Sequence, residues 1–177
     1  MEAHDEKEGA RISREPSGSG ALSGARWRAA RLWRYGPLLV WIGLIFFAST
    51  GNLSAPNTSR IIRPLLLWLF PGITEAALLQ IHFLIRKSAH FTEYAVLALL
   101  AARAFLSSSQ TLLRRRWWLA SFALVASCAL LDEYHQSLLS TRTGTIYDSL
   151  IDISGGASAL AALALWRVAH RKQYRER

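Results

Sequence analysis

Polar residues that could bind an anion or move a proton form three clusters between Arg86 and Gly156, each at the edge of or within a long apolar run. The clusters read R-K-S-A-H-F-T-E-Y at 86–94, D-E-Y-H-Q at 132–136 and R-T-G-T-I-Y-D-S-L-I-D-I-S-G-G at 142–156. Ionisable side chains at membrane depth are costly and usually mark a functional site. These clusters therefore locate a candidate site.

Three sets of candidate residues follow from the residue types. Lys87 and Arg142 could bind a phosphate or carboxylate. His90, Glu133 and Asp132 are the candidate catalytic acid and base groups, if the neighbouring carboxylates raise the pKa of one of them. The candidate ligand-binding residues are Lys87, Tyr94, Gln136, Arg142, Asp148 and Asp152.

A plainer interpretation stays open for the same residues. Asp132 and Glu133 could simply pair with Lys87 and Arg142, which would neutralise buried charges without any chemistry. A metal site is not expected, because no closely spaced ligand motif joins the histidines and carboxylates.

The elements that must position these residues are apolar stretches of about the length that crosses a bilayer. They cover Tyr35–Leu53, Ser88–Leu106, Trp117–Leu138 and Ser149–Val168. Between the first two lie shorter apolar patches, Ile61–Phe70 and Ala76–Ile85, which Pro64 and Pro71 interrupt. We therefore predict an all-α integral membrane four-helix bundle with a short interfacial or re-entrant segment between spans 1 and 2.

The net charge of +9 is explained by membrane topology rather than by nucleic-acid binding. Basic residues precede the first span, separate the second from the third at 114–116, and follow the fourth, which are alternate segments of the chain. This pattern predicts that both termini are cytoplasmic and that the polar clusters face the outer leaflet. No nucleic-acid-binding module is visible.

The domain organisation follows from this topology. Residues 1–34 are expected to form a disordered basic cytoplasmic tail, 35–168 the membrane domain, and 169–177 a second basic tail. Within the membrane domain, Lys87, His90 and Tyr94 share one helical stripe, as do Asp148, Asp152 and Gly155. Gly155 and Gly156 offer a small surface that lets a neighbouring helix approach closely.

The ordered elements K-x-x-H-x-x-x-Y, D-E-x-x-Q, R and D-x-x-x-[ND]-x-x-G resemble the VanZ-like family. They correspond here to Lys87, His90 and Tyr94; Asp132, Glu133 and Gln136; Arg142; and Asp148, Asp152 and Gly155. Two departures are Asp152, where the family commonly has Asn, and Leu138 or Leu139, where it usually has an aromatic residue.

The resemblance implies a bacterial cytoplasmic-membrane protein that acts on the cell envelope, since the founding member is associated with low-level teicoplanin resistance. The expected partners are membrane lipids and a lipid-linked cell-wall precursor. Neither an enzymatic reaction nor a cofactor follows from it. The alternatives are a membrane scaffold whose polar residues form a structural ion-pair network, and a small transporter.

Overall fold

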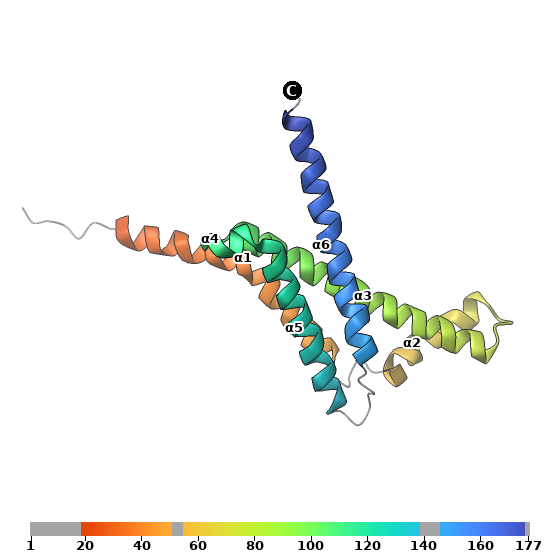
Figure 1. The fold of residues 1–177 in the computed structure, drawn as a ribbon. Helices are drawn as coiled ribbons and strands as arrows, with labels where there is room; N and C mark the ends of the chain where they lie inside the picture. Colours follow the sequence, from red (N-terminus) through yellow and green to blue (C-terminus); the bar gives the residue numbers. More distant parts are fainter. Residues whose placement is uncertain (1–18, 51–54, 139–145, 176–177) are drawn as a thin grey trace, which may run out of the picture.

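The computed structural model describes residues 19–50, 55–138 and 146–175, and every regular element in these ranges is a helix (Figure 1). The helices are α1 (Ser19–Ala48), α2 (Ala55–Leu69), α3 (Glu75–Leu106), α4 (Thr111–Arg115), α5 (Trp117–Ser137) and α6 (Ile146–Arg175). The all-α prediction is confirmed.

Helix α3 is the central element and contacts α1, α2, α5 and α6. Helix α6 crosses α3 and also packs on α5, while α1 packs on α3 and on α5 (Figure 1). The packed core includes four alanines of α3, which allow close approach of the neighbouring helices. Its members include Ala98, Ala101, Ala102 and Ala104 of α3, Val125 and Ala129 of α5, and Leu160 of α6.

The start of α3 differs from the prediction. The second apolar span was expected to begin at Ser88, with Ala76–Ile85 as a separate patch, but α3 runs without a break from Glu75. The Thr74 hydroxyl accepts a hydrogen bond from the Ala77 amide at 3.3 Å and caps the helix, and Glu75 carries a favourable charge in its first turn. Because residues 76–85 belong to α3, the predicted short segment between spans 1 and 2 corresponds to α2 alone.

Helix α2 folds back against the first turns of α3, and the two form a hairpin that projects from the helix crossing (Figure 1). Arg63 of α2 forms an ion pair with Glu75 of α3, and Ser59 lies 3.3 Å from the His82 imidazole. These two contacts hold α2 against the first turns of α3.

Two of the described helices are long and apolar enough to cross a membrane, namely residues 75–106 of α3 and 146–171 of α6. Helices α1 and α5 do not meet the same criterion, since the apolar part of α1 is short and α5 carries Asp132 and Glu133. Large apolar side chains are nevertheless exposed on all four helices, as expected for contact with lipid. Examples are Leu39, Phe47, Phe83, Leu99, Phe122, Leu130, Leu150 and Leu165.

The basic segment before the first apolar stretch is helical in part. Helix α1 begins at Ser19, so residues 19–34 continue into the apolar part of the same helix. This differs from the expected tail over 1–34, of which residues 1–18 lie outside the described ranges. Helix α6 likewise continues to Arg175, beyond the predicted domain end at residue 168.

Candidate functional site

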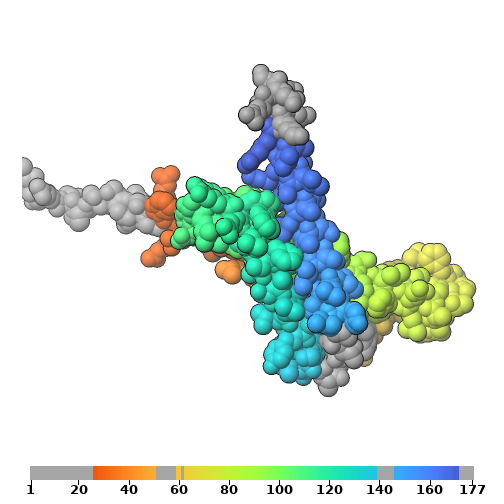
Figure 2. All heavy atoms as spheres, viewed as in Figure 1, coloured from red at the N-terminus to blue at the C-terminus, as the bar shows by residue number. Residues whose placement is uncertain are grey.

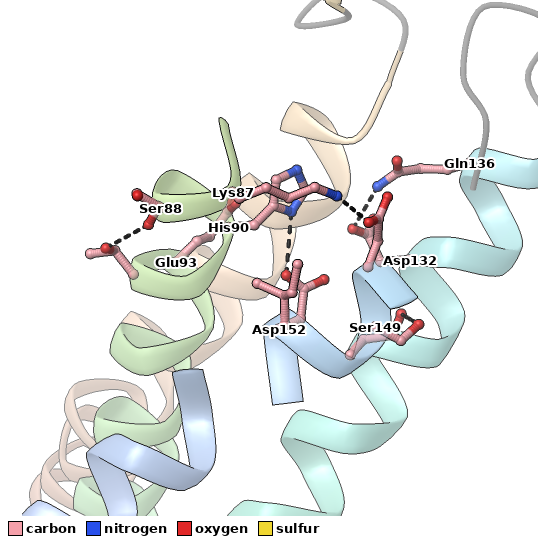
Figure 3. A network of polar contacts seen from close by, with 12 residues as sticks. Lys87, Ser88, His90, Glu93, Asp132, Gln136, Ser149 and Asp152 are labelled. Atoms are coloured by element: carbon pink, nitrogen blue, oxygen red, sulfur yellow. Dashed lines mark hydrogen bonds and ion pairs between the residues drawn. The ribbon is translucent and has the colours of Figure 1, made fainter. Parts of the chain in front are cut away.

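The predicted site residues of three helices meet where α6 crosses α3 and α5 (Figure 3). We call this place the polar junction. It consists of Lys87 and His90 of α3, Asp132 and Gln136 of α5, and Asp148 and Asp152 of α6.

The accessible edge of the polar junction is an ion pair between α3 and α6. The Lys87 ammonium donates to the Asp148 carboxylate, and the two side chains are 23% and 25% exposed. Lys87 also lies 5.3 Å from the centre of the Phe83 ring. A partly exposed pair of this kind can exchange its partner for an incoming anion more readily than a fully buried pair can.

One turn further along both helices, His90 faces Asp152. The His90 Nδ1 atom lies 3.4 Å from Asp152 Oδ1, and the Asp152 side chain is 1% exposed. Residues 87 and 90 of α3 are about one helical turn apart, and so are residues 148 and 152 of α6. The two helices therefore make two successive contacts, Lys87 with Asp148 and His90 with Asp152.

Helix α5 supplies a third side of the polar junction. Gln136 donates from Nε2 to Asp132 Oδ2 at 2.9 Å, and both residues are buried. Ser149 of α6 donates to the Ala129 carbonyl of α5 at 3.4 Å, one turn before Asp132. The predicted i, i+4 relation of Asp132 and Gln136 is thus a direct hydrogen bond.

Three of these residues converge on one point. The ligand atoms of His90, Asp132 and Asp152 all lie within 4.8 Å of one another. Asp132 Oδ1 and both carboxylate oxygens of Asp152 are buried and make no hydrogen bond with any described residue. Two buried carboxylates this close repel each other unless a proton or a cation lies between them.

The close approach of α6 depends on two glycines that follow Asp152. A Cβ atom at Gly155 would lie 2.2 Å from the Phe91 carbonyl oxygen of α3, and one at Gly156 would lie 2.6 Å from Val125 Cγ1 of α5. Phe91 is next to His90 in the chain. The predicted small-residue surface therefore sets the distance between Asp152 and the residues it faces.

The other predicted residues have different outcomes. Tyr94 is fully buried one turn after His90, and its hydroxyl makes no hydrogen bond with a described residue. Glu133 is buried, at 7% exposure, but does not belong to the group that converges with His90. Arg142 lies outside the described residues.

One contact next to the polar junction was not predicted from the sequence. The Trp41 indole of α1 donates to the Glu93 carbonyl of α3 at 3.0 Å, which ties α1 to the turn that carries His90. A tryptophan inside an apolar span gives no sign of such a role, because tryptophan also anchors helices at membrane interfaces.

The comparison with protein families matches most of the chain. The model of the VanZ/LLP1 family matches residues 35–167, which include every residue of the polar junction. No match was found among curated proteins or among solved structures.

Proposed function

Since the chain belongs to the VanZ/LLP1 family and two of its described helices are long and apolar enough to cross a membrane, we propose that it is a membrane protein that binds an anionic cell-envelope component at the polar junction. The proposed component is a lipid-linked phosphate or cell-wall precursor. The observation that carries this proposal is the partly exposed Lys87 ammonium, which Asp148 holds at the edge of the polar junction.

A network that served only to hold the helices together would satisfy its own polar groups, because each buried unpaired acceptor costs about 1–3 kcal/mol. Here Lys87 donates to Asp148 and Gln136 donates to Asp132 Oδ2, but Asp132 Oδ1 and both Asp152 oxygens have no hydrogen bond with a described residue, and neither do His90 Nδ1 and the Tyr94 hydroxyl. These unpaired groups support a binding role over a purely structural one.

The proposed roles follow from the residue types and their contacts. Lys87, at the accessible edge, exchanges Asp148 for the anionic group of the ligand, and Arg142, which precedes α6 in the sequence, assists. His90 or Glu133 acts as acid or base if the ligand is processed. Asp132, Asp148 and Asp152 orient the cations, with Gln136 as a neutral partner and Tyr94 beneath them.

The proposed topology has four spans, formed by α1, α3, α5 and α6, in a bacterial cytoplasmic membrane with both termini inside. The support is the distribution of basic residues, with Arg114–Arg116 between α3 and α5 and basic residues at both ends of the chain. The end of α5 and the start of α6, which border the polar junction, then face outward.

Cysteine labelling tests this topology with few changes, because Cys128 is the sole cysteine of the chain and is buried. In a Cys128→Ala background, we expect a membrane-impermeant maleimide to label Ser137→Cys on intact cells. Ser109→Cys should react only after the cells are permeabilised. Both positions are exposed, so access depends on the side of the membrane. The reverse pattern would overturn the proposed orientation.

Ligand binding is tested with a polyprenyl phosphate and the matching uncharged polyprenol, each added to the purified protein in detergent. We expect the wild-type chain to bind the phosphate at least about tenfold more tightly, because a charge-assisted contact to Lys87 contributes about 1.5–3 kcal/mol. Lys87→Gln should remove most of this preference. Native mass spectrometry or thermophoresis gives the two dissociation constants.

Arg63→Gln is the matched control, since Arg63 is also a cation paired with an acid but lies on α2, away from the polar junction. Its preference for the phosphate should equal that of the wild type. Equal affinity for phosphate and alcohol, or the same loss in both variants, would refute the proposed ligand class.

A structural scaffold is the second candidate, favoured by the ion pairs Lys87–Asp148 and His90–Asp152, which both join α3 to α6. In that case Lys87→Gln would lower the melting temperature and the folded yield, and the change in ligand preference would be absent. The two measurements therefore separate the candidates.

A further inference from the structure

We infer that His90, Asp132 and Asp152 form a binding site for one divalent transition-metal ion, with Zn²⁺ or Mn²⁺ as the ion. This inference stands independently of the lipid ligand. It concerns the inner part of the polar junction, where the ligand atoms of the three residues lie within 4.8 Å of one another.

The three ligands are pre-assembled by three different helices. His90 comes from α3, Asp132 from α5 and Asp152 from α6, and Figure 3 shows the His90 ring directed at Asp152. Metal–ligand bonds of about 2.0–2.2 Å require ligand atoms somewhat closer than those seen here. Small side-chain rotations supply this contraction without a change in the helix crossing.

The second support is the state of the carboxylates. Asp132 and Asp152 are both buried, yet Asp132 Oδ1 and both oxygens of Asp152 have no hydrogen bond within the described chain. Lys87 does not neutralise these two carboxylates, because it is already paired with Asp148. A divalent ion would neutralise the two carboxylate charges and occupy these buried acceptors.

The donor set indicates the type of ion. One imidazole nitrogen and two carboxylate oxygens suit Zn²⁺ or Mn²⁺, whereas Mg²⁺ and Ca²⁺ prefer oxygen ligands alone. Gln136, which donates to Asp132 Oδ2, is placed to orient this carboxylate as an outer hydrogen-bond partner. Three protein ligands also leave coordination positions open, which is the arrangement of sites that bind a further ligand.

If the proposed function holds, a phosphate oxygen is suited to one open position. The metal would then hold the same anion that Lys87 contacts, and this would explain how an acidic site accepts an anionic ligand. This step alone rests on the proposed function, because metal binding itself needs no lipid.

The test uses the full-length chain, purified in detergent without a polyhistidine tag, treated with EDTA and then equilibrated with Zn²⁺ or Mn²⁺ in the absence of lipid. After removal of free metal, we expect about one ion per chain by inductively coupled plasma mass spectrometry. Asp152→Asn and His90→Gln should each lower the affinity at least about tenfold, as expected for loss of one ligand.

Two controls match these variants. Glu75→Gln removes an exposed acid that pairs with Arg63, and His170→Gln removes an exposed histidine near the end of α6. Both should bind metal as the wild type does. Circular dichroism and the melting temperature in EDTA show whether each variant is folded before its metal content is compared.

For Mn²⁺, pulsed electron paramagnetic resonance gives a readout of the ligand itself. A nitrogen coupling should be present in the wild type and absent in His90→Gln. Less than one-tenth of an ion per chain, or equal binding by folded site variants and controls, would overturn the inference and leave a proton shared by the two carboxylates as the alternative.

Discussion

Replacing Gly155 with alanine is expected to lower the melting temperature by about 10 °C and to abolish binding at the polar junction. The added Cβ would lie 2.2 Å from the Phe91 carbonyl oxygen and 2.9 Å from its carbonyl carbon. These are backbone atoms of α3 and cannot rotate away, so α6 must move outward. Overpacking typically costs about 1–3 kcal/mol, and a clash with backbone atoms is expected at the upper end of this range because the shift also separates Asp152 from His90. Thermal unfolding in detergent and metal content measure the two effects.

Gly43→Ala is the matched control, because nothing lies within 4 Å of a Cβ at this exposed helical glycine. Its melting temperature should be unchanged or slightly higher, since alanine favours the helix by about 1 kcal/mol. Gly156→Ala should be destabilising but rescued by Val125→Ala, because the obstacle there is a side chain. No comparable rescue of Gly155→Ala by Phe91→Ala is expected. A wild-type melting temperature for Gly155→Ala would show that the helices do not approach this closely.

Asp132→Asn is expected to raise the melting temperature by a few degrees in EDTA while lowering metal affinity at least about tenfold. The substitution removes one of two buried carboxylates that lie close together. The new amide keeps an oxygen that can accept from Gln136 and adds a donor for Asp152. Sites that carry a function often have such a stability cost, and removing the functional charge recovers it. Differential scanning fluorimetry with and without metal measures both changes.

The control for this charge removal is Asp148→Asn, which leaves Lys87 without its ion-pair partner at the partly exposed edge. Its melting temperature should fall or stay unchanged, because no repulsion is relieved there. A large loss of stability in Asp132→Asn would instead mean that the carboxylate holds the helices together, and the scaffold would become the preferred function.

The faces of the helices could be predicted from the sequence. Helical spacing places Lys87, His90 and Tyr94 on one stripe and Asp148, Asp152 and Gly155 on another, and the structure brings these stripes together. The reason is that a helix repeats every 3.6 residues whatever it packs against, so the stripe is a local property.

The start of α3 was predicted wrongly because the apolar patch at 76–85 was treated as separate from the span that begins at Ser88, whereas both belong to one helix. Pro71 and Gly72 do end the preceding segment, but Thr74 and Glu75 then begin a new helix at once. This capping pattern was present in the sequence and could have identified the helix start.

The convergence of His90, Asp132 and Asp152 could not be predicted, since it depends on how three helices cross. Spacing along one helix gives no distance to a residue on another. The crossing itself is fixed by contacts such as that of Gly155 with the Phe91 backbone, which involve residues distant in the sequence. A search for short metal-binding motifs therefore finds nothing at this site.

The length of α3 has a consequence for the size of the head group that the polar junction can admit. Its 32 residues extend for about 48 Å, well beyond the ~30 Å of a bilayer core. In the proposed topology Arg103, which donates to the Trp33 carbonyl, lies at the cytoplasmic boundary of the membrane, and His90 lies about 20 Å from it along the helix. If α3 runs along the membrane normal, His90 then lies about 10 Å beneath the opposite boundary. The proposed lipid phosphate would reach that depth with its lipid chain, whereas a bulky glycan attached to it would remain at the surface, so depth would select for small head groups.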